Sequence, residues 1–125
     1  MKRDLDLIRN IMLAIENTSD QIAFKGVAEL ANAIYETDYL LVSYHVSLLI
    51  DCNYLIALDC STIGIRYADY FVERLTADGC DYLDSIRDTS IWVKTKEKLS
   101  AVGGSAALEI VKAVAVNVMR SQLGI

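Results

Sequence analysis

Apolar residues recur at helical spacing near the start of the chain. Leu5, Ile8, Met12 and Ile15 are three or four positions apart. Side chains with this spacing share one face of an α-helix, so the pattern predicts an amphipathic helix over about residues 3–17. Polar turn residues follow the stretch and predict where this helix ends.

The next periodic stretches predict a second and a third helix. The second helix follows Gly26 and stops near residues 36–38, so it is too short to be stable without packing. The third helix covers roughly residues 38–52 and carries His45 on its apolar face. Two helices joined by a short turn give the order of a helix-turn-helix. The polar side chains on the other face of the third helix are Ser43, Tyr44, Ser47 and Asp51.

Aromatic and β-branched residues at 54–59 and 70–75 predict two strands that pair as a hairpin. The long connection between them, residues 60–67, is the candidate wing, and Gly64 is its expected bend. Thr76 is a residue type that caps helices by accepting a backbone N–H from the first turn. We therefore expect a fourth helix to begin just after Thr76.

Two further helices are predicted before the end of the chain. The first covers about residues 90–99, and a glycine pair at 103–104 ends it. Ser105 is expected to cap the last helix, which reaches about Leu123.

These elements predict a fold of the α+β class that is mainly α. The expected architecture is a winged helix-turn-helix with a two-stranded β-wing and additional C-terminal helices. We assign residues 1–88 to a winged-helix domain and residues 89–125 to a C-terminal helical extension. We expect the two parts to form one compact unit.

Several stretches of the chain resemble known families. Those at 43–55 and 75–79 are similar to the recognition-helix and post-wing signatures of bacterial winged-helix regulators, except that Asn53 stands where such regulators usually have glycine. A longer resemblance covers nearly the whole chain, to a family of short uncharacterised proteins of bacteria, their prophages and phages. That family is a domain of unknown function and implies no activity. Its resemblance rests on residues 1–9, residues 44–51, residues 74–76, and Trp92 with the later Gly103-Gly104.

Composition narrows the class of protein. The chain has 125 residues, of which 54% are hydrophobic, enough for one domain with a sizeable core. Its three cysteines are irregularly spaced, which favours reduced thiols in a cytoplasm. No apolar signal segment follows the N-terminus, and charges on the last helix disfavour a membrane span. We expect a cytoplasmic protein, in the host cytoplasm if a phage encodes it.

The sequence contains no catalytic or metal-binding motif. There is no Gly-rich phosphate loop, H-E-x-x-H or G-x-S-x-G pattern. His45 is the only histidine, and its place among apolar residues favours a packed structural role over a catalytic base or ligand. The cysteines lack the spacing of a structural zinc site. We therefore expect no enzyme, no cofactor and no bound metal.

The polar face of the third helix and the wing form the candidate contact surface, because helix-turn-helix proteins touch base edges and phosphates from this face. For Tyr44 and Ser47 a solvated face without a ligand is an equal alternative, as it is for the wing residues. The residues assigned to contact with nucleic acid or a partner are Ser43, Tyr44, Ser47, Asp51, Arg66 and Tyr67.

The last helix is apolar over most of its surface, and such helices are usually buried. We predict that packing within the chain leaves part of this surface uncovered, and that two copies pair through it as a homodimer. The predicted dimer interface consists of Leu108, Val111, Val114, Ala115, Val118 and Met119.

Two functions follow from these observations. The first is a dimeric winged-helix regulator of a phage or mobile element that binds double-stranded DNA. The second is an acidic winged-helix module that binds and modulates a host or phage protein, as an inhibitor, an anti-defence protein or an adaptor. The net charge of −5 and a third helix without Lys or Arg favour the second, because acidic surfaces repel phosphate. The analogy of shape favours the first, which is our expectation by a narrow margin.

Overall fold

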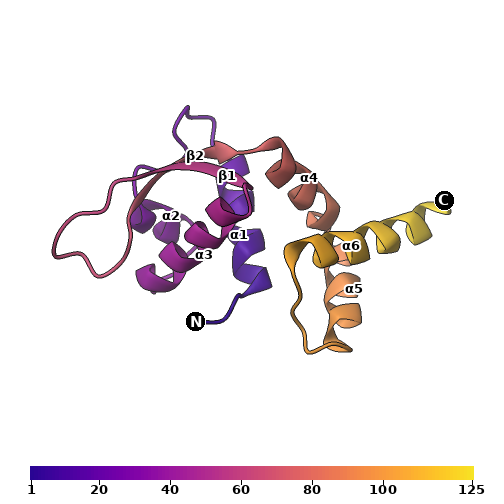
Figure 1. The fold of residues 1–125 in the computed structure, drawn as a ribbon. Helices are drawn as coiled ribbons and strands as arrows, with labels where there is room; N and C mark the ends of the chain where they lie inside the picture. The colour runs from indigo at the N-terminus through magenta and orange to yellow at the C-terminus, as the bar shows by residue number, and fades with distance from the viewer. The chain divides into compact units, whose positions relative to one another are not determined.

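The computed structural model describes all 125 residues as helices, one small sheet and their connections (Figure 1). The class is α+β and mainly α, as the sequence predicts. No helix combines the length and the apolar character that crossing a membrane requires. The elements in chain order are α1 (Leu5–Glu16), α2 (Val27–Ala33), α3 (Tyr39–Asp51), β1 (Leu55–Asp59), β2 (Tyr70–Leu75), α4 (Ala77–Ile86), α5 (Thr89–Ser100) and α6 (Leu108–Leu123).

Contacts divide the chain into two compact units, Met1–Cys80 and Asp81–Ile125. The boundary lies inside α4, whereas we expected it after residue 88 and expected a single unit. The sequence pattern marks where a helix begins and ends, but it does not show that one helix supplies residues to two units. Each unit is therefore described separately.

The first unit begins with α1, which forms where the periodicity predicts it. The carboxylate of Asp4 caps the helix by accepting the N–H of Leu7 at 3.1 Å. This bond satisfies one of the backbone donors that a helix leaves free at its N-terminus. The four residues that define the periodicity are all buried, and Leu7 and Ile11 are buried on the same helix.

The sheet of the first unit is an antiparallel hairpin with one additional bridge. Leu58 of β1 pairs with Phe71 of β2, and an irregularity lies between Ile56 and Ala57. On the other side of β2, Phe24 and Val72 exchange backbone hydrogen bonds of 3.1 and 2.8 Å. The segment between α1 and α2 therefore contributes a single residue to the sheet.

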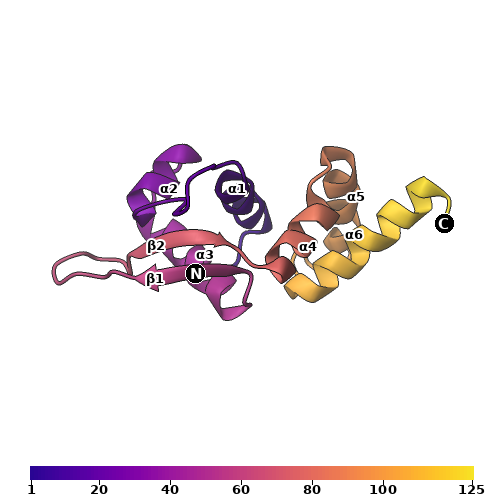
Figure 2. The same ribbon diagram turned by 90° about the horizontal axis from the view of Figure 1, so that it is seen from above.

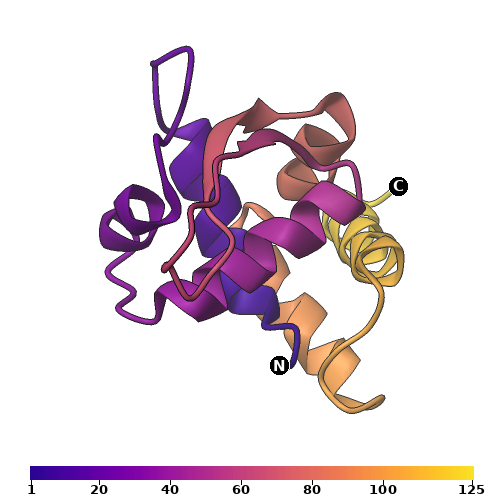
Figure 3. The ribbon, with the colours of Figure 1, turned by 60° about the vertical axis from the view of Figure 1, so that its left-hand side comes forward.

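Helices α1 and α3 pack against each other and against the hairpin, so the core of the first unit lies between helices and sheet (Figure 3). The side chains of Val42, Val46 and Leu49 are fully buried on α3. Burying such a side chain stabilises the fold by roughly 1.5–3 kcal/mol. The connection between the strands extends well past the paired residues (Figure 2).

The end of the hairpin is tied to the start of α4. As predicted, Thr76 caps this helix: its Oγ1 accepts the N–H of Gly79 at 3.0 Å, and it also donates to the carbonyl of Asn53 at 2.6 Å. Asn53 itself has φ of 59°, the left-handed conformation that closes α3. A Cβ at Gly79 would lie 2.0 Å from the carbonyl oxygen of Tyr54, so only glycine fits there.

In the second unit, α5 and α6 pack on each other. Asp88 caps α5 by accepting the N–H of Ile91 at 3.0 Å. The prediction that Ser105 caps α6 is wrong, because α6 begins at Leu108 and no side chain caps it. Leu108 is the first buried residue after the glycine pair, so packing against α5 sets the start of this helix rather than the local capping preference.

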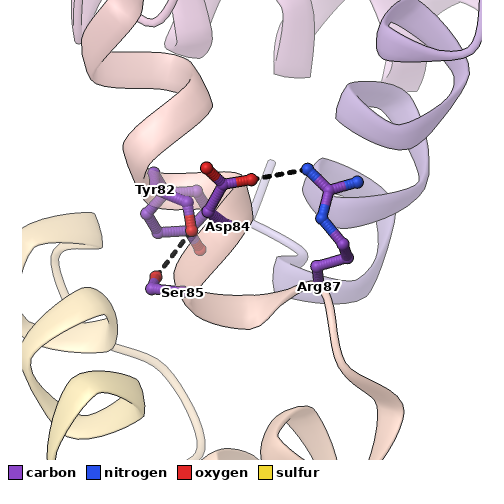
Figure 4. Close-up of polar contacts among 4 residues, drawn as sticks. All are labelled: Tyr82, Asp84, Ser85 and Arg87. Atoms are coloured by element: carbon purple, nitrogen blue, oxygen red, sulfur yellow. Dashed lines mark hydrogen bonds and ion pairs between the residues drawn. The ribbon is translucent and has the colours of Figure 1, made fainter. Parts of the chain in front are cut away.

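The second unit also contains the C-terminal half of α4 and the turn that follows it (Figure 4). The hydroxyl of Ser85 donates to the carbonyl of Tyr82 at 2.6 Å, within the helix. Arg87 and Asp84 form an ion pair at 2.6 Å. Both side chains of this pair are largely exposed, so it adds little stability.

Candidate interaction surface

Helix α3 supplies most of the predicted contact residues, and its start is well defined. The carboxylate of Asp38 accepts the N–H of Leu41 at 3.0 Å and caps the helix. The residues that follow form a 13-residue helix with one face in the core. The helix therefore forms as predicted, but its outward face differs from the prediction.

Ser43 does not lie on the outward face. Its side chain is buried, and its hydroxyl donates to the carbonyl of Ala68 at 2.5 Å. Ala68 lies at the end of the long connection, just before β2, and that part of the chain covers the face of α3 that periodicity assigns to solvent. The prediction that Ser43 contacts DNA or a partner is wrong for this reason.

His45 is the packed structural histidine that the sequence predicts. Its Nε2 accepts the backbone N–H of Asp4 at 2.8 Å, and its Nδ1 lies 2.9 Å from the carbonyl oxygen of Leu41. This arrangement requires the neutral ring with the proton on Nδ1, which donates to Leu41. Since His45 is fully buried, both nitrogen atoms serve to join α3 to the start of α1.

The other predicted residues of α3 reach the surface to different degrees. Tyr44 is half-buried, and its ring meets the His45 ring edge-on with the centroids 5.4 Å apart. The hydroxyl of Ser47 donates to the carbonyl of Tyr44 at 2.6 Å, so it is engaged within the helix. Asp51, near the end of α3, is exposed.

The wing, defined here as residues 60–69, carries the last two predicted contact residues. Arg66 is exposed, whereas Tyr67 is partly covered by Tyr39 of α3, with ring centroids 6.0 Å apart at 86°. Burial raises the pKa of Tyr67, and Asp69 and Tyr39 raise it further. Gly64 has φ of 93° and forms the bend, as predicted.

An open groove of about 520 Å³ lies between the first turn of α3 and the wing. Arg66 and Tyr67 line one side, so the structure brings these two predicted residues together with the helix. Tyr39 and Leu40 line the other side, and the sequence did not mark them because they follow the helix cap rather than the polar stripe. The groove is lined by Thr37, Asp38, Tyr39, Leu40, Gly64, Ile65, Arg66 and Tyr67.

Asp69 is a second residue that the sequence interpretation missed. Its Oδ1 accepts the N–H of Val27 at 2.8 Å and that of Tyr70 at 3.0 Å. Because Gly26 precedes α2 and has no side chain to cap it, a distant carboxylate does so. The only sign of this role in the sequence is that Gly26, the residue before α2, has no side chain that could cap the helix.

The charge of this region is strongly acidic. Between Gly26 and Glu73, Arg66 is the only Lys or Arg. A segment with this balance of charge favours cationic groups over phosphate. The acidic residues of the same segment are Glu29, Glu36, Asp38, Asp51, Asp59, Asp69 and Glu73.

The predicted dimer interface on α6 is mostly inside the chain. Val114 and Met119 are half-buried, and Ile110, which we did not assign to the interface, is 52% exposed. Packing on α5 therefore covers the arc that the sequence left for a second copy. The prediction is wrong for the four buried residues, Leu108, Val111, Ala115 and Val118.

Comparison with known proteins places the chain in a family. A family model described as "Hypothetical protein (DUF2513)" matches residues 2–105. The chain belongs to the DUF2513 family. The DUF2513 match includes α3 and the wing and ends before α6. This confirms the resemblance to a family of unknown function.

A relative of the chain matches over a longer span than the DUF2513 model. It is a protein of Haemophilus influenzae (strain ATCC 51907 / DSM 11121 / KW20 / Rd), with the description "Uncharacterized protein". The two are 30% identical over 123 residues, which is 98% of this chain and 99% of the relative. No solved structure matches the chain.

Proposed function

We propose that the chain is a protein-interaction module on a winged-helix scaffold, and that it binds its partner through the surface formed by α3 and the wing. The order of α1, α2, α3 and the hairpin supports the scaffold. So does the bridge between Phe24 and Val72, which adds a third chain segment to the sheet between the first two helices.

The charge of the surface carries the proposal. On α3, its cap and the wing, Arg66 is the only Lys or Arg, whereas Asp38, Asp51 and Asp69 supply three carboxylates. Phosphate contacts from Lys and Arg supply most of the non-specific affinity for DNA. With Ser43 buried, the surface also lacks one of the polar contacts that base readout would use. A partner protein that presents cationic groups fits this surface better than a duplex does.

DNA binding by a regulator of a phage or mobile element is the second candidate. The exposed Arg66 in the wing and the half-exposed Tyr44 on α3 favour it, because winged helices use these two positions to reach DNA.

Duplex binding across a salt series separates the two candidates. We expect a Kd of about 10⁻⁴ M or weaker at low salt, which is no tighter than the weakest ordinary non-specific binding. A tighter Kd that weakens steeply with added salt would establish the DNA-binding candidate instead.

Photo-crosslinking tests the protein partner directly. We expect Tyr67→p-benzoylphenylalanine to give a discrete protein adduct in bacterial cells that express the chain. The same photoreactive residue in place of Asn10, an exposed position on α1, is the matched control and should give none. Adducts to nucleic acid, or identical products from both positions, would contradict the proposal.

A further inference from the structure

Strand β1 has one free edge. It pairs with β2 along one side only, and the bridge to Phe24 lies on the far side of β2. The order across the sheet is therefore Phe24, β2, β1. A free edge presents unpaired N–H and C=O groups to any extended chain that approaches it.

The direction of the backbone groups shows which residues face this edge. The N–H of Cys60 donates to the carbonyl of Asp69 at 2.9 Å, and the carbonyl of Tyr54 accepts the N–H of Thr76 at 3.0 Å. Both therefore point toward the β2 side. Because backbone direction alternates along a strand, the groups that point to the free edge belong to the residues between them. These are Leu55, Ala57 and Asp59.

The solvent side of the hairpin is apolar next to this edge. Leu58 is 65% exposed and its cross-strand neighbour Phe71 is 38% exposed, while Ile56, which pairs with Arg74, is also 38% exposed. Natural sheet edges are usually protected by lysine, proline or a bulge. Strand β1 contains neither residue, and the extra residue of the bulge, Glu73, lies on β2.

The opposite side of the edge carries negative charge. Asp59 ends β1, and hydrogen bonds from the side chain and backbone of Ser61 lower the pKa of its carboxyl, so it is ionised at neutral pH. Burial raises the pKa of Tyr70, and Asp59 and Asp51 raise it further. Asp59 is paired with Tyr70 across the hairpin and lies on the face opposite Leu58, and Asp51 ends α3, the helix that packs against β1.

We propose that the free edge of β1 binds an extended, basic segment of a partner protein as an added strand. The proposal rests on the proposed protein-interaction function and specifies the chemistry of the partner. In the added strand, apolar residues would lie beside Ile56 and Leu58, and the alternate Lys or Arg residues would lie toward Asp59 and Asp51. A second copy of the chain would bring the same carboxylates to the interface, so charge complementarity favours a basic partner.

Three capped peptides test the proposal. Ac-VKVRVKV-NH2 alternates apolar and basic residues, Ac-AKAARAAKA-NH2 has the same charge with helix-forming spacing, and Ac-VEVEVEV-NH2 reverses the charge. We expect the first to bind at least about tenfold more tightly than either of the others, a difference of about 1.4 kcal/mol. In NMR spectra the amides of Leu55, Ala57 and Asp59 should shift and gain protection from hydrogen exchange. Equal binding of the two basic peptides, or no change at these amides, would overturn the proposal.

Variants of the edge provide a second test. Ala57→Pro removes the edge N–H, whereas Ala57→Val keeps it and is the matched control. We expect the first variant to lose at least about tenfold in affinity for the alternating peptide and the second to retain it. If Ala57→Pro does not fold, Leu58→Lys replaces it, with Ile63→Lys as control, since Ile63 is exposed in the wing and away from the edge. Equal affinities within either pair would overturn the proposal.

Sedimentation of the free chain tests the second copy as the occupant. A dimer that dissociates in Ala57→Pro would overturn the proposal, and a monomer would support it. The proposed function fails separately: if the photo-crosslink at position 67 captures a protein and the alternating peptide does not bind, only the proposal about β1 is wrong.

Discussion

At the scale of single residues, the fold depends on a few residues that contact or hydrogen-bond the backbone of a distant segment. Gly79 lies against the carbonyl of Tyr54, and Thr76 holds the same junction through two hydrogen bonds. His45 joins α3 to α1 in a similar way. Such positions tolerate little change because the atoms they contact belong to the backbone, which cannot rotate away.

Gly79→Ala should destabilise the protein strongly. Its methyl group would overlap the carbonyl oxygen of Tyr54, and overpacking of this kind costs about 1–3 kcal/mol or more. Gly26→Ala is the matched control, because its nearest neighbour, Asp69 Oδ1, would be 3.5 Å away, and it should cost less than about 1 kcal/mol. Urea unfolding measures both free energies; equal losses would contradict the assigned contact.

The cysteines should differ in reactivity. Burial raises the pKa of the Cys60 thiol, and Asp69 and Asp59 raise it further, so less of it is thiolate near pH 8. Cys80 is exposed. We expect iodoacetamide to modify Cys80 faster than Cys60 in the folded protein, as followed by peptide mass spectrometry. The difference should disappear in urea, where neither environment persists.

At the scale of elements, the sequence predicts the features that depend on neighbouring residues. It misses those that depend on contacts with residues far away in the sequence. The period of Leu5, Ile8 and Met12 places α1 correctly, because each of these residues faces the core of its own helix. Ser43 is misplaced, because the segment that covers it lies 25 positions away and no pattern in α3 reports it. The groove beside Tyr39 was missed for the same reason, since it exists only where the wing meets the helix.

The packing of α6 gives a prediction at this scale. Val111 is fully buried and its neighbour Ile110 is 52% exposed. Val111→Glu buries an unpaired carboxylate and should cost more than about 3 kcal/mol, whereas Ile110→Glu should cost less than about 0.5 kcal/mol. Thermal unfolding of the two variants measures the difference. Equal stability would return Val111 to the list of interface candidates.

At the scale of the whole molecule, charge and titration connect the surface to stability. The net charge is −5, and the acidic segment between Gly26 and Glu73 contains the face that we assign to partner binding. Added salt should therefore weaken binding to a basic partner.

The stability of the protein should fall as the pH rises above 10. The pKa values of Tyr67 and Tyr70 are raised in the fold, with burial as the main cause, so the folded state holds these phenolic protons more tightly than the unfolded chain does. The stabilisation is complete below the ordinary tyrosine pKa and is lost as the pH rises through the raised values. Unfolding in urea between pH 8 and 11 measures this, and the loss should be smaller in Tyr67→Phe.

The junction at Thr76 also has a consequence for the order of events during folding. The first turn of α4 takes its cap from a residue that also binds the carbonyl of Asn53, at the end of α3. That bond forms only once the hairpin has brought positions 53 and 76 together. We therefore expect the first turn of α4 to be fully stabilised only after the hairpin closes. Closure of this small sheet would then precede the stabilisation of α4 during folding.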